Sequence, residues 1–108
     1  MFSGCKSLIY LDVSKFDISR ITNMNNMFDG LEKIKKLDLK NFNTKSLQSV
    51  VYFLHNCFSL TSIDISNFDT TYFIDISGMF LNCKSLTSIN LKNFKTTNVI
   101  SMSQLFDL

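Results

Sequence analysis

The chain has 108 residues, of which 45% are hydrophobic and 19% are charged. This length and balance indicate one globular domain and exclude an intrinsically disordered segment. The formal net charge of +2 is too small to predict binding to nucleic acid or to an anionic membrane. The sequence shows no basic-then-apolar start typical of a signal peptide, and no apolar run of transmembrane length.

The whole sequence repeats with a period of 26 residues. The pairs Met1-Phe2, Met27-Phe28 and Met79-Phe80 mark the period, and no insertion interrupts it. A period of about 20 to 50 residues is typical of repeats that stack into one continuous core. We therefore expect a single solenoid domain over residues 1–108. Its repeats would span 1–26, 27–52, 53–78 and 79–104, with a partial repeat at 105–108.

The first half of each repeat predicts a short strand. In the first repeat, apolar Leu11 and Val13 alternate with polar Asp12 and Ser14, and the other repeats keep this period of two. Such a strand can bury its apolar side by stacking on its copies as parallel strands. One phenylalanine follows at the same place in every repeat and is expected to form a buried spine: Phe16, Phe42, Phe68 and Phe94.

The second half of each repeat predicts a short helix. Ile21, Met24, Met27, Phe28 and Leu31 follow a helical spacing. Residues typical of helix starts precede these segments, at Ser19, Thr44, Thr70-Thr71 and Thr96-Thr97, and residues typical of helix stops end them, at Gly4, Gly30, Asn56 and Asn82. Helices pack about 10 Å apart and paired strands about 4.8 Å apart, so the stack should curve. We expect an α/β solenoid with strands on the concave face and helices on the convex face.

The order of motifs within the repeat resembles a known family. The runs are MFSGCKSL at residues 1–8, LDVSKFD at 11–17 and IDISNFDTT at 63–71. They resemble the leucine-rich repeats of BspA-type bacterial surface proteins, including the repeats of mollicute surface lipoproteins. The resemblance implies a right-handed leucine-rich-repeat solenoid at the cell surface, with a role in adhesion or protein binding and no enzymatic activity. It supplies no functional residues.

The polar strand positions are predicted to line the concave face as ladders. This candidate binding face comprises Tyr10, Asp12, Ser14, Lys36, Asp38, Lys40, Ser62, Asp64, Ser66, Ser88, Asn90 and Lys92. Stacked strands would place the carboxylates of Asp12, Asp38 and Asp64 about 5 Å apart. Such a ladder either attracts a cation or a basic ligand, or is relieved by water and nearby lysines. We favour the second interpretation and expect no metal site.

Catalytic residue types are scarce. The chain contains one histidine, His55, and one glutamate, Glu32, and no nucleophile–base pair can be assembled around them. We therefore expect no enzymatic activity and no cofactor, with His55 at the surface. The cysteines Cys5, Cys57 and Cys83 share one inward position of the repeat and are expected to be buried free thiols.

Two functions remain open at this point. The first is a surface module that binds a protein or a host-surface ligand and forms part of a longer array. The second is a structural scaffold without a specific ligand, which self-associates end to end through uncapped ends. Neither involves nucleic acid or membrane insertion of this segment. A lysine cluster, at Lys33, Lys35, Lys36 and Lys40, is expected to be a solvated face.

Overall fold

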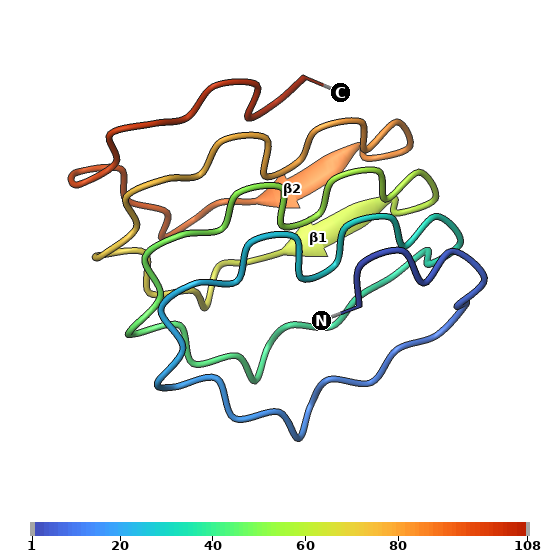
Figure 1. Ribbon diagram of the computed structural model, residues 1–108, viewed down its shortest axis with the longest axis horizontal. Helices are drawn as coiled ribbons and strands as arrows, with labels where there is room; N and C mark the ends of the chain where they lie inside the picture. The colour runs from blue at the N-terminus through green and yellow to red at the C-terminus, as the bar shows by residue number, and fades with distance from the viewer. Residues whose placement is uncertain (1, 108) are drawn as a thin grey trace.

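The structure is a computed structural model that describes residues 2–107. The chain winds through successive coils that stack from the blue N-terminal end to the red C-terminal end (Figure 1). Within the described residues there are two strands, β1 (Ser62–Asp64) and β2 (Ser88–Asn90). They pair in parallel, with Ile63 opposite Ile89. These two strands lie on neighbouring coils of the stack.

A second line of parallel pairing holds the coils together at another side of each turn. Isolated bridges join Asn23 to Ser49, Ser49 to Asp75, and Asp75 to Ser101. Each bridge connects residues one sequence period apart. The stack is therefore held by backbone pairing at two places in the coil, although only the first place reaches the length of a strand.

The expected leucine-rich-repeat solenoid with convex helices is wrong. No residue between 2 and 107 is in a helix, and the sheet consists of two short strands instead of one strand in each repeat. The second half of each coil consists of turns that close over three residues, as between the Met27 N–H and the Met24 carbonyl. The architecture is thus made of turns and short parallel pairings, with no α layer among the described residues.

The direction of the backbone N–H groups explains the missing helices. The N–H groups of Met24, Asn26, Phe28 and Gly30 donate to carbonyls of the following coil, at distances of 2.8–3.0 Å. Every second residue thus bonds across the stack, whereas an α-helix would direct each N–H to the residue four before it. Asn26 has a φ of 60°, in the left-handed region that interrupts a right-handed helix.

The core fills the inside of the coils. Met24, Met27, Phe28 and Leu31 are buried, so the residues that suggested a helix do face inward. Phe42 and Phe68 of the expected spine are buried, whereas Phe16 and Phe94, in the outermost coils, are only partly covered. The side-chain spacing therefore identified the interior correctly, although it assigned the wrong backbone conformation.

Side chains at the corners of the coils satisfy backbone groups of the next coil. The hydroxyl of buried Thr44 donates to the Asp69 carbonyl at 3.0 Å and accepts from the Asp69 N–H at 2.8 Å. Thr70 bonds Lys95 in the same way in the coil above. These threonines were expected to cap helices. They instead bridge successive coils and replace backbone pairing where the chain turns.

Candidate functional site

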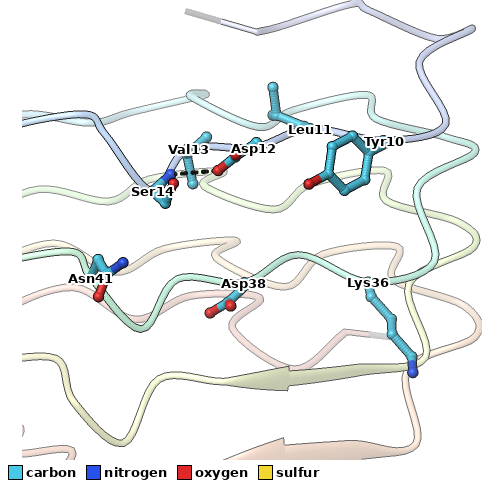
Figure 2. A pocket seen from close by; sticks show the side chains of 8 residues that line it. All are labelled: Tyr10, Leu11, Asp12, Val13, Ser14, Lys36, Asp38 and Asn41. Atoms are coloured by element: carbon cyan, nitrogen blue, oxygen red, sulfur yellow. Dashed lines mark hydrogen bonds between the residues drawn. The ribbon is translucent and has the colours of Figure 1, made fainter.

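The strand-face groove is a hollow of about 330 Å³ between the first two coils. Its lining is Tyr10, Leu11, Asp12, Val13, Ser14, Lys36, Asp38 and Asn41. Figure 2 shows Tyr10, Asp12 and Ser14 on the first coil, facing Asp38 and Asn41 on the second, while the Lys36 side chain points away from Asp38. Five residues of the predicted face thus meet at one hollow.

The groove lies where the first coil separates from the second. Among the described residues, no hydrogen bond joins segment 8–14 to segment 34–41. One coil further on, the Thr61 N–H donates to the Lys35 carbonyl, and beyond that β1 pairs with β2. The first two coils are joined at other sides of the turn, through Phe2 and Gly4 and through Met24 and Asn26. The backbone of segment 34–41 therefore has no partner across the groove, and its hydrogen bonds to another coil go to Thr61 and Asn67 of the third.

The aspartate ladder has a structural role at the strand ends. The Oδ1 atoms of Asp12, Asp38 and Asp64 each accept the backbone N–H two residues later, at 2.9–3.0 Å. Asn90 does the same for Lys92 in the last coil. The Ser66 side chain and N–H hold the pKa of Asp64 below its ordinary value, and Ser14 does so for the pKa of Asp12. Each carboxylate thus closes a local turn, a role that the alternating pattern of the sequence did not indicate.

Substitution of Asp64 tests this turn. The pKa of Asp64 is lowered in the folded state, so the Asp64 carboxylate stabilises the fold at pH values above its ordinary pKa. This stabilisation is lost as the pH falls through the folded-state pKa. We expect Asp64→Asn to keep the turn at neutral pH, as Asn90 does, and to lose less stability on acidification. Asp64→Ala should lower the melting temperature already at neutral pH. Thermal unfolding followed by circular dichroism between about pH 2 and 7 measures both effects.

The remaining residues of the predicted face lie outside the groove. Ser62 and Ser88 are exposed on β1 and β2, and Asp64 and Asn90 end these strands. The others are Lys40, Ser66 and Lys92, of which Lys40 lies 3.7 Å from the Asp38 carboxylate. The predicted face is therefore divided between an open groove on the first two coils and a paired surface on the last two, where Ser66 lines a separate hollow of about 420 Å³.

His55 is not the free surface residue that was expected. Its side chain is only 22% exposed, and Nδ1 lies 3.1 Å from Oδ1 of Asp29. The geometry of that contact does not form a hydrogen bond. The Tyr52 ring packs against the imidazole, with 5.0 Å between ring centroids. Asn26 donates to the other carboxylate oxygen of Asp29 at 2.9 Å. His55 therefore stacks on a tyrosine three residues before it and contacts Asp29 of the preceding coil.

The cysteines differ from one another. Cys57 and Cys83 are buried free thiols, as expected, but Cys5 in the first coil is exposed. The Cys57 thiol donates to the Phe28 carbonyl at 3.2 Å, and Cys83 donates to that of Leu54 at 3.0 Å. The neighbouring Cys83 thiol, together with burial, raises the pKa of Cys57. Cys57 is therefore an unreactive, protonated thiol.

Two exposed apolar features contain residues that were not anticipated at the surface, although Tyr10 itself belongs to the predicted face. Ile9 and Tyr10 are 76% and 74% exposed beside the groove. Tyr72, Ile74 and Ile100 form another exposed patch on the later coils. The only sequence signal for either feature is an apolar residue at a repeat position that is polar in other copies, as Ile9 is where Lys35 and Thr61 stand.

The described part of the chain holds no group of three or more metal-ligating side chains. Between residues 2 and 107 there is also no helix that is long and apolar enough to cross a membrane.

Fold and site together define a stacked-coil protein with an open groove of mixed charge on one face. The chain belongs to the family described as "Mycoplasma protein of unknown function, DUF285", whose model matches residues 1–108. No curated protein and no solved structure matches the chain.

Proposed function

We propose that this chain is a non-catalytic binding module that recognises a protein on a host surface through the strand-face groove. The observation that carries the proposal is the groove itself, which an aromatic ring and two carboxylates from two coils line together, with the Lys36 side chain at its edge. Recognition sites in proteins combine apolar surface with a few fixed polar groups in this way. The mixed charge suits a polypeptide, which offers both donors and acceptors.

The groove displays its side chains from fixed backbone positions. The turn closed by Asp12 holds Ser14 two residues further along, and Asp38 closes the matching turn on the second coil. Tyr10 is largely exposed beside them, and exposed tyrosine is enriched among residues that dominate binding energy. A fixed display lowers the entropy cost of binding. These features favour recognition over a purely structural role for this face.

The chemistry of the groove supports binding more than catalysis. Ser14 and Asp12 interact there, but the groove lining includes no imidazole or thiol that could act as base or nucleophile. The single histidine contacts Asp29 at another side of the coil. The location at a cell surface is proposed from the sequence resemblance to bacterial surface repeats.

Binding to immobilised extracellular-matrix proteins tests the proposal. We expect purified protein to bind at least one of fibronectin, laminin and collagen saturably in surface plasmon resonance. The double variant Tyr10→Ser and Asp38→Asn should bind at least about tenfold more weakly, because it removes an anchor and a charge while the asparagine keeps the turn.

Tyr72→Ser is the matched control, because Tyr72 is an exposed tyrosine outside the groove. It should bind like the unchanged protein. The proposal is wrong if none of the three matrix proteins binds, or if both variants bind as tightly as the unchanged protein.

A second candidate is end-to-end self-association, as a scaffold without another ligand. An apolar hollow of about 300 Å³ opens on the last coil, lined by Phe80, Leu91, Phe94, Thr96, Met102, Leu105 and Phe106. Apolar residues of the first coil, including Phe2 and Phe16, are also only partly covered. Sedimentation velocity at several concentrations decides: mass that rises with concentration supports the scaffold, and a constant monomer mass contradicts it.

A further inference from the structure

We propose that the groove binds an extended, acidic polypeptide segment, which pairs with the unpaired backbone of the first two coils and places its carboxylates beside three lysines. This inference rests on the proposed function, because it takes the same face as the binding surface and names the chemistry of the partner. Three independent features of the face support it: its charge, its apolar surface and its unpaired backbone.

The charge comes from a hollow that adjoins the groove. This lysine hollow, of about 520 Å³, is lined by Ile9, Tyr10, Lys33, Lys35 and Lys36, and it shares Tyr10 and Lys36 with the groove. The three lysines form no ion pair with a carboxylate in the described chain. Nearby Glu32 is instead 3.7 Å from Lys6. Three uncompensated ammonium groups at one hollow attract carboxylates.

The apolar surface comes from Ile9 and Tyr10. Both side chains are about three-quarters exposed, at 76% and 74%, although they stand next to the lysines. An extended segment directs alternate side chains to opposite sides. A partner that alternates acidic and apolar residues therefore turns its carboxylates to the lysines of the second coil. Its apolar side chains, on the opposite side, then meet Ile9 and Tyr10 of the first coil.

The unpaired backbone specifies an extended partner. Segments 8–14 and 34–41 make no hydrogen bond to each other in the described chain, while the equivalent segments of the last two coils form β1 and β2. Free N–H and C=O groups along a strand-like segment are a template for adding another strand. The groove lies along these two segments, as Figure 2 shows.

An anionic membrane fits this face less well. Asp12, Asp38 and Asp64 are exposed on the same face, and Asp12 and Asp38 lie two residues after Tyr10 and Lys36. The ladder would repel a flat anionic surface laid over several coils, because like charges in contact are unfavourable. A single polypeptide segment covers only the groove and the adjoining lysine hollow, where three lysines, Lys33, Lys35 and Lys36, outnumber the two aspartates Asp12 and Asp38.

Fluorescence anisotropy with a defined peptide tests the inference. The probe is a labelled peptide of about ten residues with alternating glutamate and leucine, added to the full chain in about 50 mM salt. We expect saturable binding that weakens at least about tenfold at about 500 mM salt, because the charges are screened. The triple variant Lys33→Gln, Lys35→Gln and Lys36→Gln should also bind at least about tenfold more weakly.

Matched controls separate each feature. The variant Lys15→Gln, Lys45→Gln and Lys95→Gln removes the same charge at exposed positions outside both hollows and should bind like the unchanged protein. A peptide with lysine in place of glutamate should not bind. A peptide whose alternate backbone amides are N-methylated keeps its charge but cannot donate, and it should bind at least about tenfold more weakly.

Three outcomes overturn the inference. The first is that the glutamate–leucine peptide does not bind. The second is that the two lysine triple variants lose the same amount of affinity for it. The third is that the N-methylated peptide binds as tightly as the unmethylated one. Binding to phosphatidylserine vesicles without peptide binding would assign the lysines to a membrane surface instead. The glutamate–leucine peptide could show no binding while the double variant Tyr10→Ser and Asp38→Asn still binds the matrix proteins at least about tenfold more weakly. That result would contradict only this inference and would leave the proposed function standing.

Discussion

Replacing Phe53 by alanine should lower the free energy of unfolding by about 3–5 kcal/mol. The Phe53 side chain is completely buried, in the middle of the stack. Its ring centroid lies 5.1 Å from that of Phe28 and 6.3 Å from that of Phe68, both with edge-to-face geometry. Alanine would leave a cavity touching both neighbouring rings, and coils fixed by backbone bonds above and below cannot collapse to fill it. Urea unfolding followed by far-ultraviolet circular dichroism measures the loss.

Phe106→Ala provides the matched control. Phe106 stacks on Phe80 with 5.8 Å between ring centroids, but its side chain is 50% exposed. Because it leaves no enclosed cavity, its loss should be about 1 kcal/mol or less. Similar losses for Phe53 and Phe106 would show that the interior is not packed as described.

Replacing Gly78 by alanine should also be costly, at about 2–4 kcal/mol. Gly78 has a φ of +61°, where a side chain strains the backbone. A Cβ atom at this buried position would overlap the ring of Tyr52, which lies against the glycine from the coil below. The ring would have to leave its contact with His55 to make room. Urea unfolding at neutral pH measures this loss as well.

Two further variants separate the backbone strain from the clash. Gly4 has a φ of +77°, and a Cβ atom added there would meet no other atom within 4 Å, so Gly4→Ala should cost only the strain, about 1–2 kcal/mol. In a Tyr52→Ala background, Gly78→Ala should fall to a similar cost, because the overlapping ring is gone. An unchanged cost of Gly78→Ala in that background would rule out the proposed contact with Tyr52.

The left-handed positions illustrate what a sequence can reveal locally. Asn26, Tyr52, Gly78 and Gln104 stand at one repeat position, and all four have φ values of 54° to 61°. Glycine and asparagine favour this conformation by themselves. Tyrosine and glutamine do not, so at Tyr52 and Gln104 the conformation is imposed by the stack. An interruption was readable from Asn26 and Gly78, but its presence in every coil was not.

The candidate site shows a similar division. The twelve residues of the predicted face were chosen by alternation along a strand, which correctly placed Tyr10, Asp12 and Asp38 at the surface. Alternation treats all repeats alike. It therefore could not indicate that the first coil separates from the second while the last two pair as β1 and β2. The groove arises from that difference between coils.

The sequence by itself determined which side chains are inside. The period of 26 and the apolar positions within it placed Met24, Phe28, Leu39 and Ile65 in the core, because burial follows from side-chain chemistry that each position carries. Only the tertiary structure decided where the backbone N–H groups go. Their partners lie about one repeat away in the sequence, as for Phe28 and Phe53, so bonding across the stack replaced the helices that the local spacing suggested. The same long-range pairing, left incomplete between the first two coils, opened the groove.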